Sequence, residues 1–490
     1  MGQPFSKSAT PAKIPTDTVL PLSYLDDQKV YRKMRLQVSL CFNDVLDAEK
    51  LRGAFARLLE MEGWRKLGAR LRLNSEGKLE YHLPATFNKD RPPFLYSFEH
   101  FGSSIADHPV GSRLPRGCDQ PMIFEGASKL SSLLGDPRIP RDYKEWIKLD
   151  IPQLGLRIVT FNDATCVTLT FLHSLTDAMG LAAILRAWVA ILHGKENEVP
   201  PFFGFDTNPM SAVLEKPSPR FVLADRILRG FPLLMLGVRA YLESLWYRNE
   251  GGVLFLPAEK VEQMCQNALS ELAAQNPDAD KKPFVSENDV LSAWFARALM
   301  RIEQPAANRT VIVTNAFDCR DVLAQMGIIP SPDVGLVTNC VNTCWTVVTG
   351  SQVLEEPLGL LALRVRKSLE QQRTAEQVRA SLAEVKNAID RTSYPMIIGD
   401  FHMKVLNISN WQKASFYTLD FSPAVTKVGT LLNKRDNQLG KASYICVATM
   451  GVPFSNMGAV VGKDARGNWW FTFSMCKKLW SGIEQQLKET

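Results

Sequence analysis

The chain has 490 residues, of which 46% are hydrophobic and 22% are charged, and its formal net charge is +6. This length exceeds what one typical core supports, so we expect two domains of a globular protein. The small basic excess does not indicate a nucleic-acid partner, although it suits an anionic small ligand. The nine cysteines include no C-x-x-C pair, so we expect free thiols, no disulfide framework and no metal site.

Two features bear on where the protein resides. The start of the chain lacks a charged region followed by an apolar one, and no apolar run approaches the roughly 20 residues that a membrane span needs. These patterns are typical of a cytoplasmic protein. The stretch from Gly2 to Ser6 matches the N-myristoylation pattern, so weak membrane contact through an acylated Gly2 is a hypothesis to test.

The first half of the chain alternates between strand and helix patterns. Residues 84–150 are rich in Pro, Gly and Asp and show no clear period. Elsewhere the spacing of apolar residues predicts a strand at 30–42, a helix at 47–61, a hairpin at 68–83, a second hairpin at 153–171 that turns at Asn162-Asp163, and a helix at 178–192.

A lone histidine stands where the second hairpin gives way to that last helix. His173 ends the strand, and the helix-capping types Ser174, Thr176 and Asp177 follow it. An imidazole titrates near physiological pH, so its neutral form can serve as a general base. By itself the H-x-x-x-D pattern has two fixed positions only, and Asp177 can equally cap the helix or pair with an arginine elsewhere.

A Pro-rich stretch, residues 196–219, is the best candidate for a linker, and a second α/β block follows it. Residues 221–247 are helical in type with a break at Pro232, and we expect the apolar patch 231–238 to be buried at the domain joint. Beyond it the patterns predict strands at 253–256, 309–316 and 339–348, helices at 258–274, 290–301 and 356–382, and paired strands at 440–452 and 469–475. This alternation favours two mixed α/β domains.

Several common catalytic motifs are absent from the sequence. It contains no G-x-S-x-G, G-x-x-x-x-G-K-[ST], G-x-G-x-x-G or H-E-x-x-H pattern. The usual hydrolase, nucleotide and zinc-protease sites are therefore not expected.

Six stretches follow, in order and spacing, the motifs of one enzyme family. The central one is His173-Ser-Leu-Thr-Asp177-Ala-Met-Gly180. The others are LPLSYLD at 20–26, GWRKLGARL at 63–71, the helix at 285–297, Asp318-Cys-Arg320 followed by Asn339, and Ser409-Asn-Trp411 followed by Asp420-Phe421. Together they resemble the BAHD acyl-CoA-dependent acyltransferases, and most closely the fungal branch that includes trichothecene acetyltransferases.

Two positions depart from the family pattern. Asp177 is followed by Ala178 where the family has Gly, and Gly180 comes two places later. Asp420-Phe421 is followed by Ser-Pro-Ala where the family has Gly-Trp-Gly. Because that second motif supports the coenzyme region in the family, the departure bears on the donor site and not on the histidine.

The resemblance implies an α/β fold of two domains, each similar to chloramphenicol acetyltransferase, with mixed sheets and flanking helices. The implied division is an N-terminal domain at 1–205, a long crossover at 206–250 and a C-terminal domain at 251–490. A tunnel between the domains would have His173 at its middle. Coenzyme A would enter from one face and the acceptor from the other.

The resemblance also implies residue roles. His173 would deprotonate the acceptor hydroxyl, or alternatively an amine, and Ser409 and Trp411 would stabilise the tetrahedral oxyanion. Asp177 would support the histidine loop by pairing with Arg320. The co-substrate would be an acyl-CoA, with acetyl-CoA expected, and no metal or tightly bound cofactor is needed. We expect a monomer that acts on a small-molecule alcohol of specialised metabolism.

Two alternatives stay open. A condensation-type domain would take its acyl group from a carrier protein, but such domains have a second histidine directly before the catalytic one, and here that residue is Leu172. A catalytically silent, membrane-associated binding protein is the other alternative. The intact pair His173 and Asp177 argues against silence.

Overall fold

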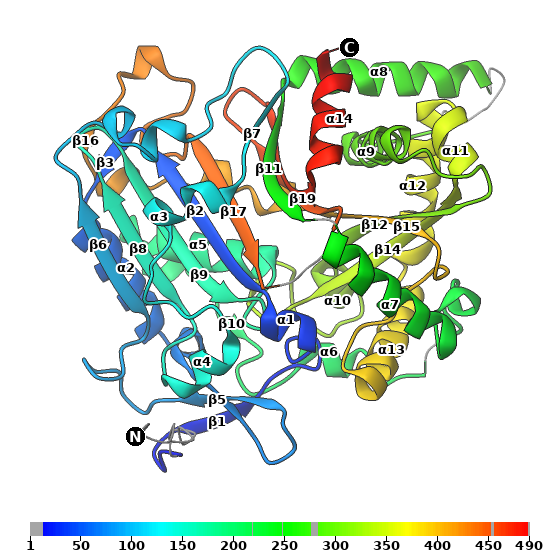
Figure 1. Cartoon of the computed structure of the whole chain (residues 1–490). Helices are drawn as coiled ribbons and strands as arrows, with labels where there is room; N and C mark the ends of the chain where they lie inside the picture. The colour runs from blue at the N-terminus through cyan, green and yellow to red at the C-terminus, as the bar shows by residue number, and fades with distance from the viewer. Residues whose placement is uncertain (1–12, 218, 247, 276–282, 452–454, 489–490) are drawn as a thin grey trace, which may run out of the picture.

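The computed structural model describes residues 13–217, 219–246, 248–275, 283–451 and 455–488. Within them the chain forms two large mixed β-sheets that lie side by side with helices packed on their faces (Figure 1). This confirms the predicted α/β class and its two acyltransferase-like halves. The acylation pattern at Gly2 lies outside the described residues. In the part of the chain that is described, no helix is long and apolar enough to cross a membrane.

The first sheet carries the histidine motif. Its strand order is β17 (Tyr444–Met450), β2 (Arg35–Phe42), β9 (Thr165–Leu172), β8 (Gly155–Thr160) and β6 (Leu95–His100). The antiparallel pairing of β8 with β9 confirms the predicted hairpin. Helices α2 (Ala48–Glu60) and α5 (Ala178–Leu192) bury their apolar faces on this sheet, where Phe55 of α2 packs on Trp188 of α5. The core therefore holds β9 and α5, which flank His173, in a fixed relation.

The second sheet has seven strands. Their order is β14 (Val341–Thr349), β12 (Thr310–Asp318), β15 (Lys404–Asn410), β18 (Met457–Lys463), β19 (Trp469–Cys476), β11 (Asn249–Leu256) and β7 (Met122–Glu125). Helices α8 (Ala258–Gln275), α9 (Glu287–Glu303), α12 (Leu358–Gln372) and α14 (Lys477–Lys488) pack on it through a second hydrophobic core. In Figure 1 these helices lie at the upper right, away from the first sheet.

Each large sheet takes one strand from the other half of the chain. Strand β7 pairs with β11 at the edge of the second sheet, and β17 pairs with β2 at the edge of the first. The predicted pairing of 440–452 with 469–475 is therefore wrong, because β19 pairs instead with β18 and β11. Alternation shows which face of a strand is buried and does not name its partner. The boundaries at 205 and 251 stay a prediction.

Smaller elements surround the two sheets. The predicted helix 356–382 is two helices, because Thr374 caps a new helix, α13, by accepting a hydrogen bond from the Gln377 N–H. The remaining elements are β1 (Thr18–Pro21), β5 (Leu79–Leu83) and β4 (Arg70–Leu73) in one sheet, the pairs β10 (Phe202–Phe203) with β13 (Gly335–Leu336) and β16 (Val425–Val428) with β3 (Asp44–Leu46), and the helices α1 (Lys29–Lys33), α3 (Ser131–Leu134), α4 (Tyr143–Lys148), α6 (Pro209–Ala212), α10 (Arg320–Gln325), α11 (Gly350–Glu355) and α13 (Ala375–Thr392).

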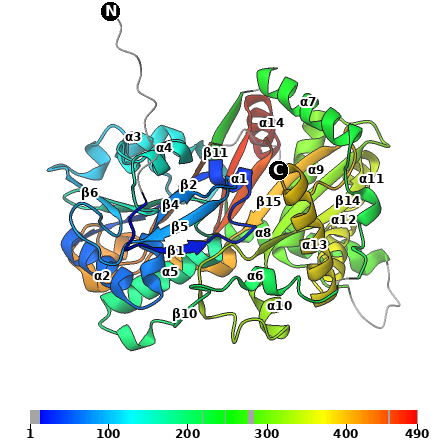
Figure 2. The ribbon, with the colours of Figure 1, turned by 90° about the horizontal axis from the view of Figure 1, so that it is seen from below.

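The apolar patch 231–238 is not buried, which corrects the expectation from the sequence. It belongs to α7 (Phe231–Trp246), which lies at the periphery of the molecule in Figure 2. Leu234 is 62% exposed, and a stripe of apolar side chains continues along the same helix to Leu245, which is 63% exposed. The opposite side, which includes Leu236, packs on the body of the protein. Pro232 stands in the first turn, where a missing N–H leaves no helical bond unmade, so it starts the helix and does not break it.

Candidate active site

The turn that carries His173 is fixed at both ends by local structure. Strand β9 is buried along its whole length and ends at Leu172. Asp177 caps α5 by accepting a hydrogen bond of 2.8 Å from the Gly180 N–H, as its residue type predicts. Between them the His173 N–H donates to the Met34 carbonyl at 2.8 Å. The histidine therefore occupies a short turn whose backbone is tied to strand, helix and neighbouring segment.

The imidazole of His173 is half-buried and faces a defined set of groups. The Tyr31 ring stacks on it with a centroid distance of 4.0 Å and an interplanar angle of 7°. The Asn339 Nδ2 donates to the His173 backbone carbonyl at 2.8 Å. Burial lowers the pKa of His173, while its own backbone carbonyl, Asp177 and Asn339 act in the opposite direction. At physiological pH the ring is thus neutral, which is the form that can accept a proton.

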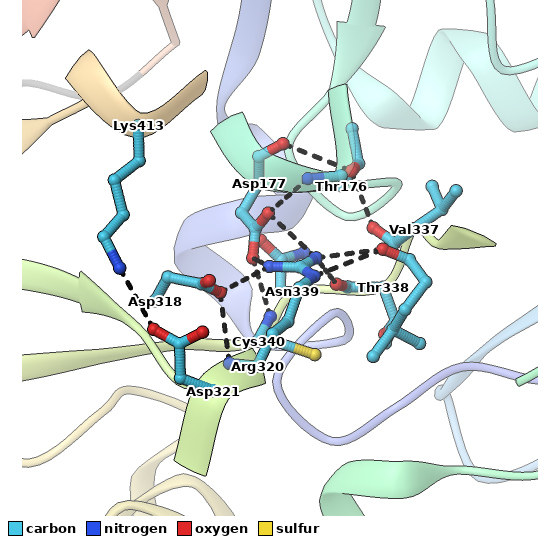
Figure 3. A network of polar contacts seen from close by, with 12 residues as sticks. Thr176, Asp177, Asp318, Arg320, Asp321, Val337, Thr338, Asn339, Cys340 and Lys413 are labelled. Carbon is cyan, nitrogen blue, oxygen red and sulfur yellow. Dashed lines mark hydrogen bonds and ion pairs between the residues drawn. The ribbon is translucent and has the colours of Figure 1, made fainter. Parts of the chain in front are cut away.

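Asp177 and Arg320 come together in the structure (Figure 3). The Arg320 guanidinium lies 3.1 Å from the Asp177 carboxylate, and the Cys340 N–H donates to the same carboxylate at 2.7 Å. Arg320 also bonds Asp318 at 2.7 Å and the Leu336 carbonyl at 3.0 Å. The ion pair links the start of α5 in one half of the fold to α10 in the other.

Both charges of this pair are almost completely removed from water. Burial opposes the charged form of Arg320, yet the neighbouring Asp177, Cys340 and Asp318 raise its pKa above the usual range. Asp177 points toward Arg320 and the Cys340 N–H, as Figure 3 shows, so its carboxylate is already engaged in structural bonds. Its geometry suits a support of the His173 turn.

Ser409 and Trp411 lie next to each other at the end of β15. The Trp411 Nε1–H donates to the Ser409 Oγ at 2.9 Å, and the indole is 8% exposed. Because the hydroxyl oxygen already accepts the indole proton, the Ser409 O–H is left to donate to a ligand. A donor that is itself hydrogen-bonded is polarised, which strengthens the bond it makes. The pair is therefore built to present one hydroxyl proton.

One cavity joins these groups. Its volume is about 490 Å³, and His173, Asp177, Ser409 and Trp411 all contribute to its wall, whereas Arg320 lies behind it. Residues of both large sheets line the cavity, which places it between the two halves of the fold. The imidazole and the hydroxyl donor thus face a common space.

The cavity wall combines cations with apolar side chains. Arg366, Arg373 and Lys413 are among its residues, and each forms an ion pair, Arg366 with Asp289 and the other two with Asp321. The apolar residues of the wall include Met34, Leu36, Val447, Met457 and Ala459. The cations suit an anionic ligand, and the apolar side chains suit an uncharged one. Among the described residues, no group of three His, Cys, Asp or Glu side chains could hold a metal ion.

Sequence reasoning assigned no role to four of the groups found here. Tyr31 of α1 stacks on the imidazole, and Asp26 in the segment before α1 bonds Asn339, which in turn bonds the His173 carbonyl. Arg366 and Lys413 come from α12 and the turn after β15, and each contributes a cation to the cavity wall. The 20–26 motif was a signal for Asp26, but nothing local distinguishes the two cations from ordinary surface charges.

A comparison with family models shows to which protein family the chain belongs. The model of the Transferase family matches residues 133–430, which include the histidine turn, Arg320 and Ser409. The chain belongs to the Transferase family. It is 43% identical over 498 residues to acetyltransferase sphE of Aspergillus fumigatus, across 98% of this chain and 97% of that relative. It is 37% identical over 462 residues to O-acyltransferase pboC of Aspergillus ustus, across 92% of this chain and 95% of that relative.

The fold of the transferase is shared by solved structures. The crystal structure of F. sporotrichioides TRI101 complexed with coenzyme A and T-2 superposes with a TM-score of 0.67, and 96% of this chain and 98% of that chain are covered. At 16% identity this likeness shows the fold. With the family and its relatives, the chain is an O-acyltransferase of the BAHD type, as the motifs predicted.

Proposed function

We propose that the transferase moves an acyl group, with acetyl expected, from acyl-CoA to a hydroxyl of a small-molecule acceptor, and that His173 is the general base. The observation that carries this proposal is a half-buried, neutral imidazole in the same cavity as a hydroxyl donor that is already polarised. A neutral imidazole can take a proton, and a fixed donor can stabilise the charge that develops.

The reaction follows from the position of these groups. His173 removes the proton of the acceptor hydroxyl while the hydroxyl oxygen attacks the thioester carbonyl and a C–O bond forms. The carbonyl oxygen becomes a tetrahedral oxyanion, to which the Ser409 O–H donates. The C–S bond then breaks, and the thiolate of coenzyme A leaves with the proton returned by the imidazolium. No acyl-enzyme is formed.

The residues of the cavity wall suit both substrates. The phosphates of coenzyme A carry negative charge, so Arg366, Arg373 and Lys413 suit the donor, and a phosphate would share these cations with Asp289 and Asp321. Apolar residues of the wall such as Met34 and Val447 suit an alcohol with an apolar skeleton. We therefore infer that donor and acceptor meet at His173 within this cavity. An amine acceptor remains the alternative nucleophile.

The first test is a comparison of two histidine variants with acetyl-CoA and a panel of apolar alcohols, with release of the free thiol as readout. We expect His173→Ala to lower the rate about 10²–10⁴-fold, which is the usual contribution of a general base. His193→Ala is the matched control, because His193 follows α5 and lies outside the cavity wall. Equal rates for the two variants would refute the assignment of the base.

The proposed contact between Lys413 and the phosphates of the donor can be tested with a truncated substrate. Lys413 is 62% exposed at its side chain, so Lys413→Ala should fold normally. We expect it to raise KM for acetyl-CoA but not for S-acetyl-N-acetylcysteamine, which lacks the phosphates. Lys144→Ala, on the distant helix α4, is the control for a general loss of positive charge. A rise in KM for both donors would place the phosphates elsewhere.

The alternative activities predict different results. A carrier-dependent condensation activity would require an acyl-carrier protein and give no transfer from acetyl-CoA, and the residue before the base, Leu172, is packed in a hydrophobic cluster. A silent binding protein would release no thiol with any acceptor. Three further proposals rest on sequence patterns. Gel filtration tests the monomeric state, cell fractionation tests the cytoplasmic location, and intact-mass measurement tests acylation at Gly2.

A further inference from the structure

The short segment from Asp26 to Met34 contacts His173 at two points and reaches it at a third through Asn339. Tyr31 of α1 stacks on the imidazole ring, with the centroids 4.0 Å apart. The Met34 carbonyl accepts the His173 N–H at 2.8 Å. Asp26 accepts from the Asn339 Nδ2 at 2.6 Å, and the same amide group donates to the His173 carbonyl at 2.8 Å. One segment thus reaches the ring, the amide and the carbonyl of the histidine.

We propose that Tyr31 is a positioning residue that sets the orientation and the basicity of His173, and that Asp26, acting through Asn339, holds the backbone on which this depends. The proposal rests on the proposed role of His173 as base. His173 then has two supports. The segment from Asp26 through α1 holds the imidazole and the backbone at one end of the turn, and the Asp177–Arg320 pair holds the other end.

The stack acts on the charged form of the base. Rings that are parallel within 7° leave the imidazole little freedom to rotate about its Cβ–Cγ bond. When His173 takes the substrate proton it becomes a cation in a buried site, and the face of an aromatic ring attracts a cation that lies over it. The charged side chain that acts on the imidazole is Asp177, which Arg320 already pairs. Burial raises the pKa of Tyr31, so its phenol stays neutral and offers no second base.

Asp26 fixes the side chain that holds the histidine carbonyl. It is 3% exposed, and its two oxygens accept from the Thr338 hydroxyl, the Asn339 N–H and the Asn339 Nδ2. A carboxylate only accepts, so it turns the NH₂ end of Asn339 toward itself and the His173 carbonyl. An asparagine at position 26 can keep these bonds, because its oxygen accepts the two Asn339 donors and its NH₂ donates to the Thr338 hydroxyl. An alanine cannot.

The effect of the Tyr31 ring on His173 is tested by comparing the wild type with the variants Tyr31→Phe and Tyr31→Leu. Phenylalanine keeps the ring, whereas leucine keeps bulk without the aromatic face. In NMR titrations of labelled histidine, with His173→Ala to assign the signal, we expect Tyr31→Leu to lower the pKa of His173 by about half a pH unit and Tyr31→Phe to leave it unchanged. In acyl transfer we expect Tyr31→Leu to lower kcat about 10-fold with both KM values unchanged.

Two results would overturn the role of Tyr31. An unchanged His173 titration in Tyr31→Leu would remove the effect on basicity, and a raised KM with unchanged kcat would make Tyr31 a substrate contact only. The titration needs no substrate, so it decides the proposal even if the wild type transfers no acyl group. In that case the proposed function would fail by itself.

The role of Asp26 is tested with a matched pair of variants, Asp26→Asn and Asp26→Ala. We expect Asp26→Asn to keep kcat within about 2-fold, because it keeps the hydrogen bonds, and Asp26→Ala to lower kcat about 10-fold or more at unchanged KM. The histidine signal should broaden or move in Asp26→Ala and not in Asp26→Asn. Equal kcat in the two variants would show that Asp26 does not act on the base. Measuring kcat on the fraction that is folded, which urea unfolding gives for each variant, separates positioning from loss of fold.

Discussion

The ion pair between Asp177 and Arg320 allows a quantitative test of how the two halves of the fold hold the base. The perturbations are Asp177→Asn, Arg320→Ala and the double variant. The side chains are 9% and 3% exposed, so removing Arg320 leaves Asp177 as a buried charge without a cation, whereas removing the Asp177 charge leaves Arg320 with Asp318 alone. Breaking such a pair typically costs about 3–5 kcal/mol.

The surroundings refine this magnitude for each variant. Asp177→Asn keeps an oxygen for the Gly180 N–H, but its NH₂ must face the Arg320 guanidinium and the Cys340 N–H, both of which are donors. Arg320→Ala leaves Asp177 and Asp318 as buried carboxylates. We therefore expect about 3 kcal/mol for the first variant and about 5 kcal/mol for the second, against a total stability of roughly 5–15 kcal/mol.

The assay is urea unfolding of the four proteins of the cycle, with kcat measured on the fraction that is folded. Because the two residues touch, we expect a coupling free energy of about 1–3 kcal/mol and a lower kcat in both single variants. The exposed pair of Lys386 and Asp390 on α13 provides the control cycle, for which we expect less than about 1 kcal/mol. Additive losses at Asp177 and Arg320 would refute the pairing and leave Asp177 as a helix cap alone.

Three further predictions follow from burial and hydrogen bonding. Burial raises the pKa of Asp26 to about 6, against about 3.9 in the unfolded chain. Between these values the folded state binds more protons than the unfolded state, so the free energy of unfolding should fall by about 3 kcal/mol from pH 4 to pH 7. We expect urea unfolding measured across this pH range to show no such fall in Asp26→Asn. Ser409→Ala should lower kcat about 10²–10³-fold and Trp411→Phe less, because the indole acts through the serine; equal losses would show that both contact the oxyanion. On α7, Leu234→Gln should change stability by less than about 0.5 kcal/mol and Leu236→Gln by more, and the reverse order in thermal unfolding would show that the outer face is covered.

Local sequence determined the elements that carry the histidine. The β-branched residues before His173 and the capping residue Asp177 after it predict a strand, a turn and a helix, and all three are present. These signals are local, because strand preference, cap chemistry and helix periodicity depend on neighbours in the chain. The order of six motifs along the chain identified the family for the same reason, since each motif is a short linear pattern.

Only the tertiary structure decided which distant residues meet. The ring stacked on His173 comes from Tyr31, the amide on its carbonyl from Asn339, and the cations of the cavity wall from α12 and the turn after β15. The exchange of β7 and β17 between the sheets and the exposed face of α7 also escaped the sequence patterns. The period of a pattern shows that a face is apolar, but what covers that face depends on the packing of whole elements, and the spacing within one element contains no information about its partner.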